Sequence, residues 1–212
     1  MNKSYLITRP EHDDTTYYLS KWNENTLDVA KRKGMKTFDL HQEKANKSEV
    51  ESRLKKLNPD LIVFNGHGSE DTVTGHQQEP IIIADKNDDL LKSKIIFALS
   101  CKSAKVLGPK SVEKGAISYS GFSDDFVFLY DQNKITRPTE DKTAKLFLEP
   151  PKIFIEALIK GNTVLESSKR AEKKMEENIV KSLGHPEDAN LVRFLWWDLK
   201  HFTSHGDLNA SL

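Results

Sequence analysis

Short apolar runs alternate with longer amphipathic segments between residues 5 and 119 of this chain. Residues 61–64 (Leu-Ile-Val-Phe) and 95–99 (Ile-Ile-Phe-Ala-Leu) are apolar at every position, which is typical of strands buried on both faces of a parallel sheet. Residues 18–30 instead place apolar side chains three or four positions apart, as one face of a helix does. This alternation predicts an α/β fold of three layers, α/β/α, with a mainly parallel central sheet.

The same patterns give the expected elements. Strands are expected at residues 5–7, 35–40, 61–64, 81–83, 95–99 and 116–119. Helices are expected at residues 18–30, 48–57, 153–159 (after Pro150-Pro151) and 164–183. Capping boxes at Ser48/Glu51 and Thr163/Glu166 mark two of the helix starts. Because no repeat and no long linker interrupts the pattern, residues 1–212 are expected to form a single domain.

Charge and cysteine content restrict the function further. The 212 residues carry 32 Lys and Arg against 32 Asp and Glu, and this zero net charge gives no electrostatic reason to expect nucleic-acid binding. No signal-peptide core is visible, and no apolar run approaches the roughly 20 residues that cross a bilayer. We therefore expect a cytoplasmic protein with no membrane partner. The single cysteine, Cys101, excludes an internal disulfide and a cysteine-rich zinc site.

Two of the fully apolar strands end in residues that suit nucleophilic catalysis. His67, within a Gly-His-Gly sequence, follows residues 61–64, and Cys101 follows residues 95–99. In a parallel sheet both would emerge at the same edge, where α/β proteins bind their ligands. A cysteine attacks as its thiolate, and a nearby imidazole removes the thiol proton and returns it to the leaving amine. The backbone amides of Gly68 and Cys101 are candidates for an oxyanion hole.

The sequence around these two residues resembles that of a known family. Phe-Asn-Gly-His-Gly at residues 64–68 and Leu-Ser-Cys-Lys-Ser-Ala at residues 99–104 are similar to the histidine and cysteine motifs of caspase-fold cysteine peptidases. That clan includes caspases, legumain, gingipains, clostripain, separase and the CHAT-domain proteases. Residues 115–122, 154–166 and 202–208 resemble later segments of its gingipain/CHAT-like branch, although Leu208 stands where proline is usual.

The resemblance implies a three-layer caspase-like fold and a cysteine endopeptidase. It implies hydrolysis of peptide bonds through an acyl-enzyme on Cys101, with His67 as partner, on a protein or peptide substrate. It implies no metal and no organic cofactor. Apart from the resemblance, a short chain without an attached sensor domain suggests a regulatory protein as a second kind of partner. In this clan the histidine either removes the thiol proton or polarises the carbonyl and protonates the leaving group, and the sequence leaves both roles open.

Acidic residues near these motifs favour a basic side chain before the cleaved bond. Asp124 and Asp125 follow the strand expected after Cys101, and we expect them to bind a Lys or Arg side chain of the substrate. A second acidic source follows the first strand: Glu11, Asp13 and Asp14. Arg9, close by, would instead favour an acidic substrate. Solvated loop charge is the ordinary interpretation of each of these residues.

Several alternatives stay open at this point. Taken singly, Cys101 also fits a small core residue and His67 a turn residue. A catalytically silent member of the same fold would act as a regulatory or adaptor protein, although such members usually lose the dyad. A flavodoxin-like or receiver-like binding module is disfavoured, because the chain has no G-x-G-x-x-G or Walker sequence. His201 and His205 have the i, i+4 spacing of a helical zinc pair, but no glutamate follows His201 and no paired cysteines exist.

Overall fold

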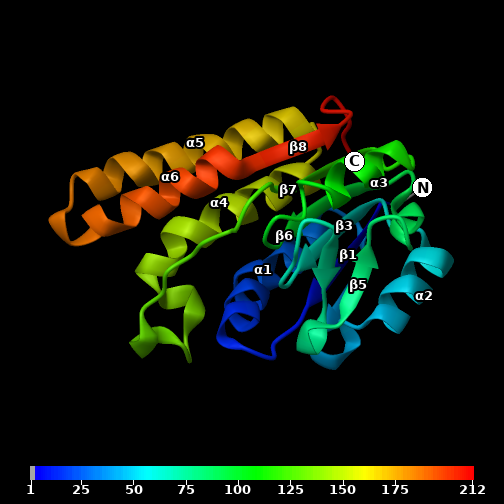
Figure 1. Ribbon diagram of the computed structural model, residues 1–212, viewed down its shortest axis with the longest axis horizontal. Coiled ribbons are helices and arrows are strands. Elements are labelled where there is room, and N and C mark those ends of the chain that lie inside the picture. Colours follow the sequence, from blue (N-terminus) through cyan, green and yellow to red (C-terminus); the bar gives the residue numbers. More distant parts are fainter. Residues whose placement is uncertain (1–2) are drawn as a thin grey trace.

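Six strands form one central sheet in the computed structural model, which describes residues 3–212 (Figure 1). The strands are β1 (Ser4–Arg9), β2 (Lys36–His41), β3 (Leu61–Asn65), β6 (Ile95–Leu99), β7 (Ser118–Phe122) and β8 (Phe202–Gly206). Their order across the sheet is β2-β1-β3-β6-β7-β8. Neighbouring strands from β2 to β7 are parallel, and β8 runs antiparallel to β7. The predicted α/β architecture with a mainly parallel sheet is therefore confirmed.

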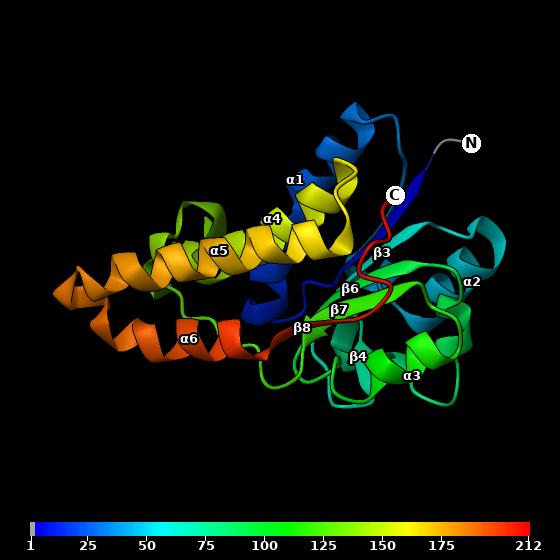
Figure 2. The ribbon, with the colours of Figure 1, turned by 90° about the horizontal axis from the view of Figure 1, so that it is seen from above.

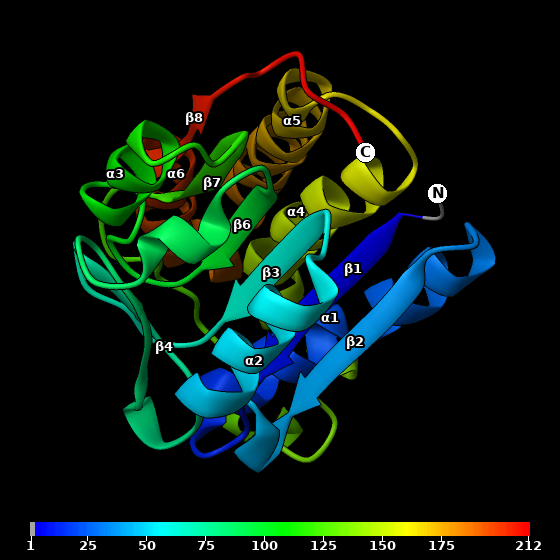
Figure 3. The same ribbon diagram turned by 90° about the vertical axis from the view of Figure 1, so that its right-hand side faces the viewer.

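Helices cover both faces of this sheet (Figure 3). On one side lie α1 (Asp14–Arg32), α4 (Lys142–Ile159) and α5 (Val164–Leu183), and on the other lie α2 (Lys47–Leu57) and α3 (Leu107–Glu113). The remaining helix, α6 (Val192–His201), packs against α5, and this pair extends beyond the sheet (Figure 2). No helix between residues 3 and 212 has the length and apolar character that crossing a bilayer requires.

Alternation of side chains along β3 and β6 explains why both runs are wholly apolar. Successive side chains of a strand point to opposite faces of the sheet, so each run contributes to two cores. Residues 61, 63, 95, 97 and 99 join the core that contains α1 and α4. Residues 62, 64, 96 and 98 join the core that contains α2 and α3. Each of these side chains is at most 2% exposed, so the two strands form the rigid centre from which the site loops leave.

The strand predicted at residues 81–83 forms, but it lies outside the central sheet. β5 (Pro80–Ile83) pairs antiparallel with β4 (Thr72–Thr74), a short strand not anticipated from the sequence. Ile81 and Ile82 are fully buried on the α2 side. The apolar run therefore marks a hairpin that covers one core and not a strand of the main sheet.

α2 begins earlier than the sequence predicts. Its N-cap is Asn46, whose side-chain oxygen accepts a hydrogen bond from the Glu49 amide at 2.9 Å. The capping box predicted to start at Ser48 is therefore wrong, because asparagine caps a helix as well as serine does and comes first here. The box formed by Thr163 and Glu166 is confirmed at the start of α5.

Pro150 and Pro151 lie inside α4 and not before it. The predicted start of a helix after this pair is wrong, since α4 already begins at Lys142. A proline inside a helix leaves the carbonyl four residues earlier without its usual amide donor. For Pro150 that carbonyl belongs to Leu146, and the side chain of Asn178, from α5, donates to it at 2.7 Å. A buried amide of the next helix thus replaces the missing hydrogen bond.

Candidate active site

The chain reverses its direction across the sheet at β1. It passes from β1 outward to β2 and then returns to β3 on the other side of β1. Such a reversal leaves a crevice between the loops that follow the two strands, and α/β proteins bind ligands in this crevice. The loop after β1 holds His12 and Asp13, and the loop after β3 holds His67. The next loop along the same edge, after β6, holds Cys101.

Two glycines let the His67 loop pass close to its neighbours. A β-carbon on Gly66 would collide with the carbonyl oxygen of Thr74, and one on Gly68 would lie 2.9 Å from the carbonyl oxygen of Cys101. Only glycine avoids these contacts, because it has no β-carbon. The Gly-His-Gly sequence is therefore a packing requirement, and it brings the backbone of Gly68 against that of Cys101.

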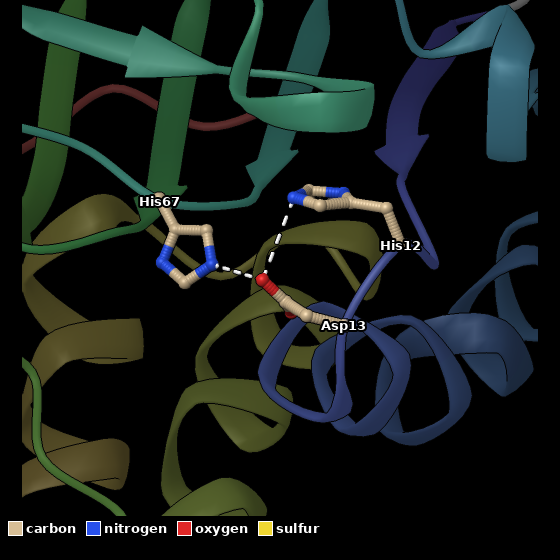
Figure 4. Close-up of side chains that lie close together, drawn as sticks. All are labelled: His12, Asp13 and His67. Atoms are coloured by element: carbon tan, nitrogen blue, oxygen red, sulfur yellow. Dashed lines mark hydrogen bonds and ion pairs between the residues drawn. The ribbon is translucent and has the colours of Figure 1, made fainter.

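Asp13 holds the imidazole of His67 (Figure 4). His67 Nε2 lies 2.6 Å from Asp13 Oδ2, and the His67 side chain is about one-third exposed. Asp13 is also the N-cap of α1, and its Oδ1 accepts hydrogen bonds from the Thr16 amide at 2.7 Å and the Thr16 hydroxyl at 2.8 Å. The helix end thus fixes one carboxylate oxygen and leaves the other directed at His67.

The electrostatics of this pair favour a charged aspartate. Partial burial acts to raise the pKa of Asp13, but hydrogen bonds from Thr16 and His67 outweigh burial and lower this pKa below its ordinary value. Because a charged carboxylate only accepts, His67 Nε2 carries the proton of their hydrogen bond. In a neutral imidazole, Nδ1 is then the nitrogen without a proton. His67 is thereby held in the form whose Nδ1 accepts a proton.

Cys101 lies on the α1 side of the sheet. Leu99 faces the α1 core, and two residues later the half-buried Cys101 packs against the same core. The thiol donates to the carbonyl oxygen of Phe126, at 3.8 Å from Sγ. Burial raises the pKa of Cys101, and the carboxylate of Asp125 acts in the same direction. The resting cysteine is therefore a protonated thiol at neutral pH.

The His67 and Cys101 loops meet through their backbones. The Gly66 amide donates to the Leu99 carbonyl at 3.3 Å, and Gly68 lies against Cys101. The imidazole of His67 and the thiol of Cys101 hydrogen-bond to different partners. The structure thus brings the two predicted catalytic residues into contacting loops at one edge of the sheet, and it adds Asp13 to them.

Asp124 and Asp125 lie beside the Cys101 loop, where Lys102 pairs with both. Lys102 Nζ is 3.0 Å from Asp125 Oδ2 and 3.9 Å from Asp124 Oδ1. The Lys102 amide also donates to the Asp124 carbonyl at 3.0 Å, and its φ of 59° lies in the left-handed region that side chains rarely adopt. The two carboxylates predicted to bind substrate are therefore next to the thiol, and they balance the charge of a lysine.

The segment after β7, residues 123–130, is tied to α6. Four hydrogen bonds do this: Ser123 N and Oγ to the His201 carbonyl (2.9 and 3.2 Å), Val127 N to Asp198 Oδ1 (3.0 Å) and Trp197 Nε1 to the Asp125 carbonyl (2.9 Å). Asp198 is 3% exposed, and burial raises its pKa well above the ordinary value of an aspartate. Because Phe126 of this segment contacts the thiol, α6 positions part of the surroundings of Cys101.

Arg9 and Glu11 are engaged in a buried network of hydrogen bonds and ion pairs. Arg9 is 3% exposed and donates twice to Asp39, at 2.9 and 2.6 Å. Glu11, whose side chain is 6% exposed, accepts from Ser20 at 2.7 Å. Neither of their charges is available to select a substrate. Asp14 stays exposed at the start of α1.

His12 is a member of the site that sequence reasoning missed. The His12 and His67 rings lie on either side of the Asp13 carboxylate (Figure 4), with His12 Nε2 3.4 Å from Asp13 Oδ2. One atom of each of these three residues lies within 4.8 Å of the other two, a grouping that suits a metal ion. His76 packs edge-on against His12, with ring centroids 5.4 Å apart. His12 could be found only by knowing the order of the strands in the sheet, because the adjacency of β1 and β3 is what brings their two loops together.

His201 and His205 are not arranged as a helical zinc pair. His201 ends α6, and its Nδ1 hydrogen-bonds to the Trp197 carbonyl at 2.8 Å. His205 lies in β8, and its Nε2 hydrogen-bonds to the Ala104 carbonyl at 2.9 Å. The spacing of four residues does not place both rings on one helix face, because the helix ends between them.

Comparison with known proteins gives a likeness of fold. No protein-family model matches the sequence, and no curated protein matches it. The structure is similar to the complex of Porphyromonas gingivalis RgpB pro- and mature domains (TM-score 0.64, 10% identity, 98% of this chain and 47% of that chain). It is also similar to the crystal structure of the Arg-specific cysteine proteinase gingipain R, RgpB (TM-score 0.60, 12% identity, 99% of this chain and 47% of that chain). The chain thus spans about half the length of the chains that it matches.

This likeness establishes the class of fold. A mostly parallel six-stranded sheet between two layers of helices is the caspase-like arrangement of these gingipain structures. The three-layer α/β/α fold predicted from the motifs is therefore confirmed. At 10–12% identity the comparison shows the fold alone, because one fold hosts many activities.

Proposed function

We propose that this chain is a cysteine endopeptidase in which Cys101 is the nucleophile and His67 its acid–base partner. One observation carries the proposal: His67 and Cys101 lie in contacting loops at the carboxyl ends of neighbouring parallel strands, with Asp13 holding His67. The likeness of the fold to a cysteine proteinase supports the same chemistry. Neither a metal nor an organic cofactor is needed for it.

The proposed reaction uses each of these groups in turn. His67 Nδ1 takes the thiol proton, Cys101 Sγ attacks the peptide carbonyl carbon, and the proton passes to the leaving amine as the C–N bond breaks. Water then attacks the acyl-enzyme, gives a proton to His67, and restores the thiol. Asp13 stabilises the imidazolium that forms twice in this cycle. The transfer requires the imidazole and the thiol to come within hydrogen-bonding distance when a substrate is bound, as catalytic groups often do only in the complex.

Backbone amides at the same place suit the oxyanion that the attack creates. We assign this role to the amides of Gly68 and Cys101, whose backbones are in contact. The hydrogen bonds that flank Gly68 use the amides of Ser69 and Thr74 as donors. The Gly68 amide is therefore not needed to hold its own loop.

The carboxylates of Asp124 and Asp125 support a preference for Lys or Arg before the cleaved bond. A cationic side chain of the substrate would take the place of Lys102 between them. Removing that competitor with Lys102→Gln is expected to raise kcat/KM for Arg and Lys peptides by about 2- to 5-fold, the value of an exposed ion pair. Asp125→Asn is expected to lower kcat/KM for the same peptides.

A panel of peptides that differ only in Arg, Lys or Asp before the cut measures this preference. Lys105→Gln is the matched control, because Lys105 is an exposed lysine that pairs with the distant Glu70. An unchanged ratio of Arg to Asp cleavage in Lys102→Gln and in Asp125→Asn would refute the assignment of these carboxylates.

The activity itself is tested with the purified full chain and a fluorogenic peptide library. We expect cleavage by the wild type, and its loss in both Cys101→Ala and His67→Ala. If the wild type cleaves no peptide, or if Cys101→Ala cleaves equally well, the chain is not a cysteine peptidase.

A second candidate function is a catalytically silent regulatory or adaptor protein of the same fold. The observation that favours it is the placement of Cys101, which is half-buried and hydrogen-bonds to the Phe126 carbonyl and not to His67. Alkylation by a peptidyl chloromethyl ketone, which occupies the substrate site when it reacts, separates the two functions. The enzyme predicts that His67→Ala slows alkylation of Cys101, whereas the silent protein predicts equal rates.

We further propose that residues 1–212 act as one peptidase domain in the cytoplasm, on protein or peptide substrates and under the control of a protein partner. The central six-stranded sheet draws strands from Ser4 through Gly206, which supports one domain. A compartment that keeps thiols reduced suits a lone reactive cysteine. Cell fractionation and affinity capture with Cys101→Ala test the location and the partner.

A further inference from the structure

His12 is a buried imidazole whose ring nitrogens are both unsatisfied. Its side chain is 11% exposed, and neither Nδ1 nor Nε2 has a hydrogen-bond partner among residues 3–212. Leaving buried polar atoms unpaired costs free energy, so an imidazole of this kind calls for a ligand. The groups around it are the Asp13 carboxylate and the rings of His67 and His76, whose centroids lie 5.9 and 5.4 Å from that of His12.

The spacing of three of these groups fits a tetrahedral metal ion. Zn²⁺ binds nitrogen and oxygen at about 2.0–2.2 Å, which puts neighbouring ligand atoms of a tetrahedron about 3.3 Å apart. His12 Nε2 and Asp13 Oδ2 are 3.4 Å apart. Asp13 Oδ2 and His67 Nε2 are 2.6 Å apart because a proton joins them, and replacing that proton by an ion opens the pair by less than about 1 Å.

The donor set selects the kind of ion. Two imidazoles and one carboxylate suit Zn²⁺, whereas Mg²⁺ and Ca²⁺ take oxygen ligands almost exclusively. Three protein ligands leave the fourth position to water, which is the arrangement of an open zinc site and not of a closed structural one.

We propose that His12, Asp13 and His67 form a reversible Zn²⁺ site, and that bound Zn²⁺ switches the peptidase off. The inhibitory half of this proposal rests on the proposed role of His67. Zn²⁺ takes the lone pair of His67 Nε2, so the single proton of the neutral ring moves from Nε2 to Nδ1. Nδ1 is then a donor, and it no longer accepts the thiol proton of Cys101. Asp13 at the same time becomes a metal ligand instead of the partner of an imidazolium.

Binding is measured on the full chain, by titrating ZnCl₂ into metal-free protein in a calorimeter and by the visible absorption of bound Co²⁺. We expect one ion per chain. His12→Asn and Asp13→Asn are each expected to weaken binding at least about tenfold, since each removes a ligand. Asparagine caps a helix as well as aspartate does, so Asp13→Asn keeps the start of α1. Thermal melts by circular dichroism check that both variants fold.

Two further variants make the assignment specific. The matched control is His185→Asn, an exposed histidine outside the cluster, which is expected to bind Zn²⁺ like the wild type. Cys101→Ser is expected to keep full affinity, because the thiol is not a ligand. Any of three results would overturn the site. These are loss of binding in Cys101→Ser, equal affinity in His12→Asn and wild type, and no stoichiometric binding at all.

Inhibition is measured as the cleavage rate against ZnCl₂, with each protein compared with its own zinc-free rate. We expect inhibition of the wild type that EDTA reverses, and at least about tenfold more ZnCl₂ for equal inhibition of His12→Asn. If the protein binds one Zn²⁺ per chain but cleaves no peptide in the absence of zinc, the proposed peptidase function and its inhibition by zinc are overturned. The metal site would then still stand. Cleavage that saturating Zn²⁺ leaves unchanged would overturn the inhibitory role, while the proposed peptidase would stand.

Discussion

Asp13 performs two tasks with one carboxylate. Its Oδ1 caps α1 through Thr16, and its Oδ2 holds His67 Nε2. Because the helix cap fixes the carboxylate, the orientation and tautomer of the imidazole depend on how α1 begins. A regular element therefore positions the proposed acid–base residue more firmly than a free loop would.

The variant Asp13→Asn separates these two tasks. Asparagine still caps α1, but its amide donates to His67 Nε2 and forces the ring proton onto Nδ1. We expect kcat/KM for peptide cleavage to fall by about 10²- to 10⁴-fold, with little change in melting temperature. The neighbouring variant Asp14→Asn is the control and is expected to keep its activity. Full activity in Asp13→Asn would show that the carboxylate does not serve catalysis.

The pH dependence of alkylation reports the environment of Cys101. Burial and the charge of Asp125 raise the pKa of the thiol, and the thiolate is the form that reacts. The rate of iodoacetamide labelling is therefore expected to rise with pH to a midpoint above the roughly 8.5 of an ordinary cysteine. Asp125→Asn removes one cause and is expected to lower the midpoint. A wild-type midpoint below the ordinary value would mean that a thiolate–imidazolium pair already exists at rest.

At the scale of elements, α6 carries a buried carboxylic acid next to the segment that contacts the thiol. Asp198 Oδ1 accepts from the Val127 amide, while Oδ2 is buried without a hydrogen-bond partner among residues 3–212. Burial raises the pKa of Asp198, so the folded protein holds this proton more tightly than the unfolded chain does. Protonated Asp198 therefore contributes its full stabilisation to the folded protein below about pH 3.9, the pKa of an aspartate in the unfolded chain. This stabilisation is lost as the pH rises through the pKa of Asp198 in the folded protein.

Asp198→Asn is expected to remove this pH dependence. The amide oxygen still accepts from Val127, and no charge is left to desolvate. The variant should be at least as stable as the wild type at pH 7, and their difference should vanish near pH 4. Asp198→Ala instead loses the acceptor and is expected to unfold about 1–3 kcal/mol more easily. Denaturant melts at pH 7 and pH 4 measure these differences in stability. The expectation is contradicted if Asp198→Asn loses stability relative to the wild type when the pH is raised from 4 to 7.

The contact between α4 and α5 is the second prediction at this scale. Asn178 supplies the hydrogen bond that Pro150 withholds from the Leu146 carbonyl. Asn178→Ala leaves that carbonyl buried and unpaired, so we expect the free energy of unfolding to fall by about 1–3 kcal/mol. Asn25→Ala, at an exposed position of α1, is the control and should stay within about 0.5 kcal/mol of the wild type. Equal stability of the two variants would show that the Leu146 carbonyl needs no partner.

At the scale of the whole molecule, the sequence predicts the layers of the fold better than it predicts the order of the strands in the sheet. Runs such as residues 61–64 and 95–99 are apolar at every position because both faces of these strands are buried. The same logic places His67 and Cys101 at one edge. The run at residues 81–83 looks alike but covers a core from a hairpin, since burial and not sheet membership sets the pattern.

Long-range contacts were beyond sequence reasoning for a physical reason. Asp13 reaches His67 across 54 residues, and Asn178 reaches Leu146 across 32. Both depend on which strands and helices become neighbours, and local patterns do not encode that. The sequence predicts Asp13 to be either solvated loop charge or a second acidic source for a basic substrate, because a capping carboxylate and a solvated one look the same in sequence.

The hydrogen bonds that tie residues 123–130 to α6 form late in the synthesis of the chain. They come from residues 197–201, which follow their partners by 71 to 78 positions. A ribosome adds about 5–20 residues per second, so several seconds separate the synthesis of Cys101 from that of the helix that orders its surroundings. During that interval a nascent chain has its thiol without a formed site. If the chain is the proposed peptidase, it therefore cannot cleave proteins while it is still being translated. This protects both the nascent chain itself and its neighbours on the polysome.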